Sequence, residues 1–139
     1  MRSKKLSILL AVLALIVSTL ACSFGASEPT LGNVRTAKDE KGEQLSSVFS
    51  TTDTIYVLGD ISNGKKGNIV SSKWMVSSVE GYDPGYVIDS VDYTLDQDSF
   101  SYAVNFYFQP PTGGWPAGKY KVEVSFNGAL NSTVEYTVQ

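Results

Sequence analysis

The chain has 139 residues, a length that suits one domain rather than two. It contains 11 basic and 14 acidic residues, a single cysteine and no histidine. The lack of histidine excludes Ser-His-Asp and Cys-His hydrolases and nearly all zinc and copper sites. A lone cysteine excludes an internal disulfide. The composition therefore favours a protein that is not an enzyme and needs no cofactor.

Residues 1–21 have the organisation of an export signal. Met1–Lys5 carries three positive charges, and the apolar run Leu6–Ala21 follows it directly. This run of 16 residues is shorter than the roughly 20 that a membrane-spanning helix needs. A basic start, a short apolar stretch and a small residue before the cleavage point are typical of secreted proteins.

The chain's only cysteine, Cys22, comes directly after this signal. The stretch Thr19–Cys22 resembles the cleavage site of bacterial lipoproteins, in which the signal is cut before a cysteine that then carries diacylglycerol. The resemblance implies that acylated Cys22 anchors the protein to the cell membrane or the outer membrane, outside the cytoplasm. Two alternatives stay open: an ordinary signal peptidase cuts after Ala21, or the segment is retained uncut.

Cleavage before Cys22 leaves 8 basic and 14 acidic residues, so the mature chain has a net charge of −6. Such a balance disfavours nucleic acid as a partner, because both are anionic. Residues 22–42 are polar and predict a tether, in which Leu31–Asp39 is a possible first edge strand. Residues 43–139 then form the folded domain.

From Val48 onward, apolar and polar residues alternate, which predicts half-buried β-strands. In the longest stripe, Phe100, Tyr102, Val104, Phe106 and Phe108 all face the core. The segment Tyr86–Leu95 breaks the rule because Asp89 falls among its inward positions, which predicts a bulge or an edge strand. The expected strands are Thr54–Ser62, Asn68–Val79, Tyr86–Leu95, Phe100–Phe108, Tyr120–Phe126 and Val134–Val138.

Turn residues separate these segments. Asn63–Gly67 predicts a hairpin loop, Asp83–Gly85 a turn, and Pro110–Gly114 the end of the long strand. Asn127–Gly128 is the strongest two-residue hairpin signal in the chain. About seven strands and no helix predict a single all-β sandwich of two sheets.

The segment Pro116–Val124 resembles the tyrosine corner of immunoglobulin and fibronectin type III domains, with Gly118 two residues before Tyr120. This resemblance implies that Trp74 is the core tryptophan. We expect Trp115 to cap the core; the alternative is that it binds a sugar or a protein from its Pro/Gly-rich loop. The wider pattern resembles bacterial surface lipoproteins with an immunoglobulin-like domain. Their fold hosts many unrelated functions, so the resemblance does not identify a ligand.

Two groups of apolar residues are candidates for binding. Tyr82 and Tyr86 flank the Asp83–Gly85 turn, where exposed aromatic rings can stack on sugars or anchor a protein; ordinary packing is the alternative. Strand parity also predicts an outer patch on two neighbouring strands, a possible docking face unless another segment covers it. The patch comprises Tyr56, Leu58, Ala103 and Tyr107.

An acidic run comprises Asp89, Asp92, Asp96 and Asp98. Its spacing does not match an EF-hand loop, so we expect charges that protect an edge strand rather than a calcium site. The sequence thus predicts an exported, membrane-anchored, non-catalytic binding or structural component of the cell envelope, with an unknown protein or glycan partner. A carbohydrate-binding or calcium-binding accessory domain is the alternative, and an enzyme is a remote one.

Overall fold

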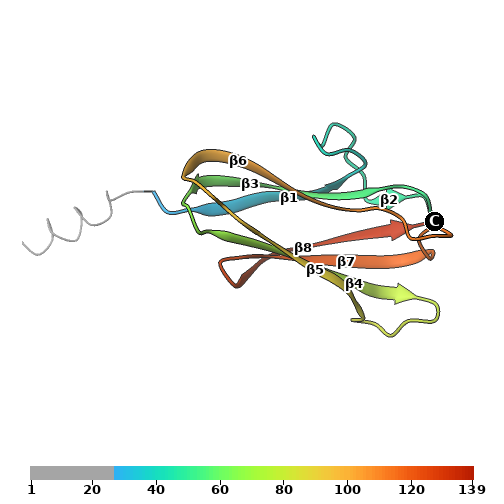
Figure 1. Ribbon diagram of the computed structural model, residues 1–139. Coiled ribbons are helices and arrows are strands. Elements are labelled where there is room, and N and C mark those ends of the chain that lie inside the picture. Colours follow the sequence, from blue (N-terminus) through green and yellow to red (C-terminus); the bar gives the residue numbers. More distant parts are fainter. Residues whose placement is uncertain (1–26) are drawn as a thin grey trace, which may run out of the picture.

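The computed structural model describes residues 27–139, which form eight β-strands and no helix (Figure 1). The all-β prediction is confirmed, with one strand more than expected, because the two residues of β2 are too few to show alternation. No helix in residues 27–139 is long and apolar enough to cross a membrane. The predicted signal and Cys22 lie outside the described residues. The strands are β1 (Thr30–Ala37), β2 (Val48–Phe49), β3 (Ile55–Gly64), β4 (Ile69–Val79), β5 (Val87–Thr94), β6 (Ser99–Phe108), β7 (Gly118–Phe126) and β8 (Ala129–Val138).

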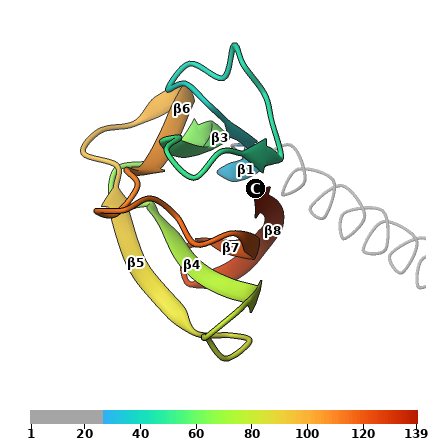
Figure 2. The same cartoon turned by 90° about the vertical axis from the view of Figure 1, so that its right-hand side faces the viewer.

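The strands form two sheets that face each other (Figures 1 and 2). One sheet has the order β1-β3-β6, and the other has the order β2-β8-β7-β4-β5. All pairs are antiparallel except β2 with β8. The possible first strand in residues 22–42 is β1, an edge strand of the smaller sheet, so the sandwich begins at Thr30. The predicted edge position of β5 is also confirmed, and its pairing with β4 contains a register shift.

The core lies between the sheets because alternation sends every second side chain inward. Trp74 of β4 is 1% exposed, and its ring lies 4.5 Å from that of Phe108 on β6, measured between centroids. Its Nε1 donates a hydrogen bond to Ser72 Oγ at 3.1 Å, so the buried indole N–H has a partner. Burial of the surrounding apolar side chains is the main stabilising contribution. They include Ile55, Val57, Ile61, Val70, Val76, Val122, Val124 and Val138.

The β6–β7 connection ends in the predicted tyrosine corner. The hydroxyl of Tyr120 donates a hydrogen bond to the carbonyl oxygen of Pro116 at 2.6 Å. Gly118 is required between them, because its φ is +147° and a Cβ there would lie 2.5 Å from the Ser78 carbonyl oxygen. This corner, the strand order and the buried Trp74 together are characteristic of an immunoglobulin-like β-sandwich.

The predictions from turn residues are confirmed in three cases and wrong in one. The long strand β6 ends at Phe108, just before Pro110–Gly114. The Asp83–Gly85 turn joins β4 to β5 in a hairpin. Asn127 and Gly128 join β7 to β8 with φ values of +51° and +83°, as a tight turn requires. The Asn63–Gly67 loop is not a hairpin, because it passes from β3 in one sheet to β4 in the other.

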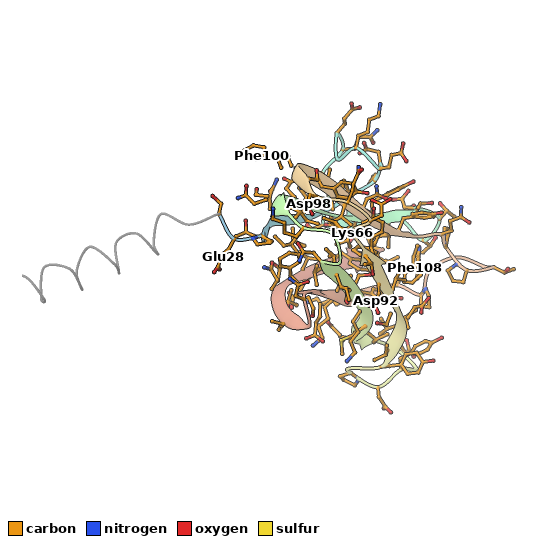
Figure 3. All side chains as sticks on the ribbon, turned by 60° about the vertical axis from the view of Figure 1, so that its left-hand side comes forward. Glu28, Lys66, Asp92, Asp98, Phe100 and Phe108 are labelled. Atoms are coloured by element: carbon orange, nitrogen blue, oxygen red, sulfur yellow. The ribbon has the colours of Figure 1, made fainter. Side chains whose placement is uncertain are left out.

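Phe100 was expected in the core but is 86% exposed. It lies at the start of β6, and Figure 3 shows it on the outside of the domain, whereas Phe108 lies further along the strand. Leu95 fills the core at this end instead: it is 2% exposed and packs beneath Gly64. The β5–β6 connection thus supplies the buried residue, Leu95, at a place in the core that the alternating pattern assigned to Phe100 of β6.

The two ends of the sandwich carry different connections (Figure 1). We call the end at which β1 starts the proximal end. It also holds the β3–β4, β5–β6 and β7–β8 connections. The distal end holds the β2–β3 connection (residues 50–54), the β4–β5 turn (80–86), the β6–β7 connection (109–117) and the end of β8. This division follows from the antiparallel pairing, since each strand reverses the direction of the one beside it.

A tyrosine pair joins the two sheets where β5 approaches β6. The rings of Tyr93 and Tyr102 stack with centroids 5.7 Å apart and planes 12° from parallel. Their hydroxyl oxygens lie 2.6 Å apart and share a hydrogen bond. This bond, with some burial, raises the pKa of Tyr93 to about 12.

We expect the free energy of unfolding to fall as the pH rises from about 10 to about 12. The raised pKa means that the folded state favours the neutral Tyr93 phenol. Its contribution is therefore complete below the unfolded pKa and is lost as the pH rises through the folded pKa. Tyr102→Phe removes the partner hydroxyl and should lower the pKa of Tyr93, measured by phenolate absorbance. An unchanged titration would show that the hydrogen bond is not the cause.

The neighbouring buried tyrosines Tyr120 and Tyr136 allow a matched test of the tyrosine corner. Their rings stack at 5.2 Å, but the Tyr136 hydroxyl has no hydrogen-bond partner among the described residues. Tyr120→Phe should lower the free energy of unfolding by about 1–2 kcal/mol, because it deletes the bond to Pro116. Tyr136→Phe should lower the free energy of unfolding by no more than about 0.5 kcal/mol, and it can raise it, because it removes a buried hydroxyl without a partner. Urea denaturation measures both, and equal losses would contradict the assignment.

Candidate binding pocket

The distal end contains a pocket of about 200 Å³ between the β4–β5 turn and the β6–β7 connection. Strands β4, β5 and β7 supply its remaining walls. It brings together Tyr82 and Tyr86, which the sequence singled out, with Trp115, which the sequence placed in the core cap. The lining residues are Val76, Tyr82, Tyr86, Ile88, Pro111, Trp115, Pro116 and Tyr120.

The β4–β5 turn holds the two exposed tyrosines at the rim. The Tyr86 amide donates to the Asp83 carbonyl oxygen at 3.0 Å, and the Gly85 amide donates to Val76 at 2.8 Å. Tyr82 and Tyr86 are 46% and 52% exposed, and their ring centroids lie 5.4 Å apart with planes inclined at 55°. The turn therefore presents two aromatic faces that are not used to fill the core.

Trp115 forms a rigid wall of the pocket. It is 6% exposed, which confirms that it caps the core. Its backbone N–H donates to the Thr51 carbonyl oxygen at 2.7 Å, and its Nε1 donates to the Asp53 carbonyl oxygen at 2.9 Å. Because both donors have partners, the indole offers a ligand its carbon framework rather than a hydrogen bond.

Tyr120 lies beside Trp115, with ring centroids 6.2 Å apart and planes at 71°. Burial raises the pKa of the Tyr120 phenol, and the nearby Tyr82 phenol adds to the rise. The phenol therefore stays neutral at ordinary pH. Four aromatic side chains thus line one small pocket, two at its rim and two fixed by the core.

The electrostatic setting of the pocket is acidic. No charged side chain lines it among the described residues, but Glu80 and Asp83 lie in the adjoining turn. Between Trp74 and Gly118 the sequence has six acidic residues and no lysine or arginine. The lining offers aromatic faces and phenol oxygens, groups that suit recognition more than proton transfer or nucleophilic attack.

The outer patch predicted from strand parity is only partly exposed. Tyr56 and Tyr107 are directly paired across β3 and β6, with ring centroids 5.7 Å apart, and Tyr107 is 57% exposed. Leu58 is 3% exposed, so its assignment to an exposed docking face is wrong. The loop after β1 folds over it, and Gly42 lies against its side chain. Whether the two tyrosines bind a partner stays a prediction.

The acidic residues of the predicted run do not converge. Asp89 is paired with Trp74 and Asp92 with Ser71, so they leave opposite faces of β5. Asp98 instead accepts a hydrogen bond from the Lys66 amide at 2.8 Å at the proximal end (Figure 3). Among residues 27–139, no group of three or more histidine, cysteine, aspartate or glutamate side chains is arranged to hold a metal ion.

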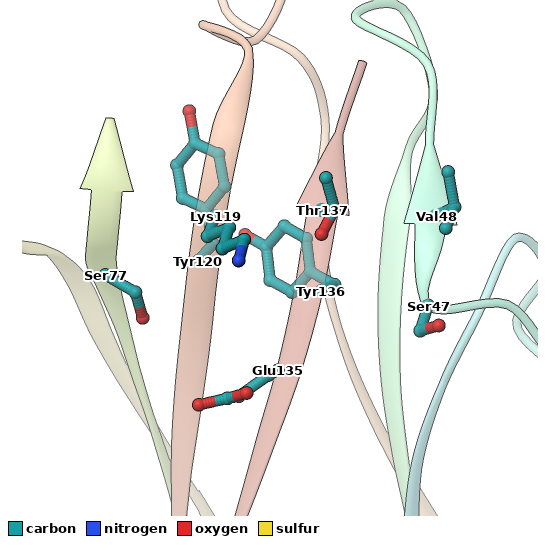
Figure 4. A pocket seen from close by; sticks show the side chains of 8 residues that line it. All are labelled: Ser47, Val48, Ser77, Lys119, Tyr120, Glu135, Tyr136 and Thr137. Carbon is teal, nitrogen blue, oxygen red and sulfur yellow. The ribbon is translucent and has the colours of Figure 1, made fainter. Parts of the chain in front are cut away.

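A second, larger hollow lies over β8 and its neighbours (Figure 4). Its volume is about 320 Å³, and Lys119 and Glu135 on the outer face of the sheet contribute to its lining. The hydroxyls of Ser77 and Tyr136, which also contribute, are buried without a hydrogen-bond partner among the described residues. Sequence reasoning missed this hollow. It includes Ser77, which lies at a register shift between Val76 and Ser78 that the alternating pattern does not signal.

No protein-family model and no curated protein matches the chain. Among solved structures, a β-glucosidase of Erythrobacter marinus is 13% identical, with a TM-score of 0.53 over 81% of this chain and 15% of its own. A β-glucosidase of Listeria innocua in complex with laminaribiose is 12% identical, with a TM-score of 0.50 over 84% and 17%. An immunoglobulin-like protein of Pseudomonas aeruginosa is 13% identical, with a TM-score of 0.49 over 83% and 99%.

The chain therefore spans less than a fifth of each glucosidase, and at such identity the likeness shows the fold alone. The class of protein follows from the strand order and the tyrosine corner, which define an immunoglobulin-like β-sandwich module.

The rim and the wall of the pocket should respond differently to truncation. Tyr82→Ala and Tyr86→Ala should each lower the free energy of unfolding by less than about 1 kcal/mol, because both side chains are half exposed. Trp115→Ala should lower it by about 3–5 kcal/mol, because it empties part of the core. Urea denaturation checks this. A large loss in either tyrosine variant would assign that residue to packing.

Proposed function

We propose that the protein is an exported, membrane-anchored immunoglobulin-like module without catalytic activity. It presents the distal aromatic pocket to a partner in the cell envelope. The observation that carries this proposal is the placement of the pocket, whose walls include the β4–β5 turn and the β6–β7 connection. Figure 1 shows both connections at the end opposite the start of β1. A tether that begins at Cys22 leads to the proximal end, so the pocket faces away from the anchor.

The length of the tether supports this geometry. Ser23–Thr30 has eight residues, which span at most about 26–29 Å when fully extended. That reach lets the domain stand clear of the lipid surface while it stays close to it. The charge of the mature chain, −6, agrees with a domain that does not lie flat on anionic lipid.

A binding role rather than an enzymatic one is supported by the chemistry of the lining. The pocket contains tyrosine, tryptophan, proline and aliphatic side chains, and the chain has no histidine to act as a general base. Pockets of this kind recognise ligands by stacking and shape.

Carbohydrate binding is the second candidate. It is favoured by the exposed pair of Tyr82 and Tyr86, because inclined aromatic faces at a rim can stack on the apolar face of a sugar ring. A glycan array probed with the wild-type protein and with Tyr86→Ala tests it. A glycan that the wild-type protein binds and Tyr86→Ala does not bind supports this candidate. A glycan that both proteins bind equally contradicts it.

The anchoring half of the proposal predicts that Cys22→Ala releases the protein from membranes. The wild-type chain, expressed in bacteria with radiolabelled palmitate, should carry the label and sediment with membranes, because its acyl chains insert into the bilayer. Cys22→Ala should lose the label and leave the membrane fraction, whereas the control variant Ser23→Ala should keep both properties. An unlabelled wild-type chain that still sediments with membranes would favour an uncut anchor.

A further inference from the structure

We infer that the distal pocket binds a small organic cation of the quaternary ammonium type. This inference rests on the proposed binding function and assigns the ligand chemistry of the same pocket. Three features carry it: the aromatic lining, the distribution of charge around the pocket, and the scarcity of free hydrogen-bond acceptors within it.

The aromatic lining provides the attraction. The side chains of Tyr82, Tyr86, Trp115 and Tyr120 reach the pocket from the β4–β5 turn, the β6–β7 connection and β7. The rim rings are inclined at 55° to each other, and the two wall rings are inclined at 71°. All four rings line the same pocket of about 200 Å³, so a cation bound there lies near several aromatic rings, whose faces are negatively polarised.

The charge distribution strengthens this attraction. Residues 74–118 supply seven of the eight lining side chains. They contain six acidic and no basic residues, whereas the remaining mature chain has eight of each. Of these six acidic residues, Glu80 and Asp83 lie in the β4–β5 turn that forms the rim of the pocket, whereas Asp98 lies at the proximal end. The first basic residue after this segment is Lys119 of β7. Its neighbour Tyr120 faces inward, so Lys119 lies on the outer face of the sheet.

The hydrogen-bonding groups distinguish a quaternary ammonium from a lysine side chain. Apart from three tyrosine hydroxyls, the lining side chains offer no hydrogen-bond acceptor, because the indole N–H of Trp115 only donates and the proline and aliphatic side chains have no polar atom. No carboxylate lines the pocket among the described residues. A primary ammonium would bring three N–H donors into a site with few acceptors, whereas a quaternary ammonium has no N–H to leave unpaired.

The size of the pocket agrees with this ligand class. Its volume of about 200 Å³ is below the roughly 300–1,000 Å³ of sites that enclose drug-sized molecules. A compact trimethylammonium group suits this volume, with the rest of its molecule extending past Tyr82 and Tyr86 into solvent. The group could belong to a free compound or to the phosphocholine of a lipid headgroup. The acidic surroundings favour the free cation, because a phosphate would be repelled.

The test is isothermal titration calorimetry of the full-length protein, purified in a non-ionic polyoxyethylene detergent that carries neither sugar nor ammonium groups. The probes are choline and its neutral carbon isostere, in which a tert-butyl group replaces the trimethylammonium group. Choline should bind at least about tenfold more tightly than the isostere, because only choline gains the cation–π contribution. Equal affinities would overturn the inference.

Variants locate the binding. Tyr86→Ala should weaken choline binding by about 3- to 30-fold, whereas Tyr86→Phe retains the ring and should change it by less than about threefold. Phe100→Ala removes another exposed aromatic ring, outside the pocket, and should have no effect. A loss in Phe100→Ala equal to that in Tyr86→Ala would contradict the assigned site.

Two further probes separate the possible sources and the two proposals. Phosphocholine and phosphatidylcholine vesicles should bind more weakly than choline; tighter binding of the vesicles would overturn the preference for a free cation. If choline fails to bind while a glycan binds in a Tyr86-dependent manner, the cation is wrong but the binding module stands. If no probe depends on Tyr86, the pocket is not a binding site and both proposals fail.

Discussion

The hydrogen bond from the Tyr120 hydroxyl to the Pro116 carbonyl oxygen holds the β6–β7 connection against the end of the sandwich. That connection crosses from the three-stranded to the five-stranded sheet, so its position determines how the sheets close over the core. Gly118 lets the chain pass within contact distance of Ser78 on β4, where any side chain would collide. Without this approach, Trp115 would lose its place beneath the β2–β3 connection, and the wall of the pocket would go with it.

The same constraint explains why the pocket combines fixed and adaptable parts. Trp115 and Tyr120 are core residues, and their polar atoms are hydrogen-bonded to the protein, so their positions do not depend on a ligand. Tyr82 and Tyr86 lie in a turn and are half exposed. Their rotation changes the mouth of the pocket without disturbing the core. In the proposed binding function, a rigid wall would lower the entropy lost on binding, and the half-exposed rim side chains could adjust to the ligand.

Much of the fold was predictable because alternation is a local signal. Trp74, Tyr120 and the Asn127–Gly128 turn follow from a few neighbouring residues each, and all three occur as expected. Parity specifies which side of a strand a residue leaves, but it does not specify what covers that side. Leu58 therefore looked exposed, although a loop distant from the strand pattern buries it, and Phe100 looked buried.

The candidate site was predictable only in part, for a related reason. Tyr82 and Tyr86 could be identified because they flank a recognisable turn. Their proximity to Trp115 and Tyr120 depends on the pairing of β4 with both β5 and β7, which brings together residues up to 38 positions apart. The alternation of residues within one strand does not predict which strands pair with one another. The core assignment of Trp115 was correct, yet it hid the fact that a buried ring can also form the wall of a pocket.

The two ends of the sandwich differ in their charged residues. Residues 74–118 contain six acidic and no basic residues, and two of the six, Glu80 and Asp83, lie in the β4–β5 turn at the distal end. At the proximal end, Lys65 lies 3.6 Å from Asp98, and the Lys66 amide donates to the same carboxylate, which lowers the pKa of Asp98. Because Asp98 stays ionised, it offsets the charge of Lys65, and this end gains little attraction to anionic lipid. In the proposed arrangement, the anchor rather than the surface of this end holds the domain near the membrane. At the distal end, Glu80 and Asp83 adjoin the pocket and favour the approach of cations over anions.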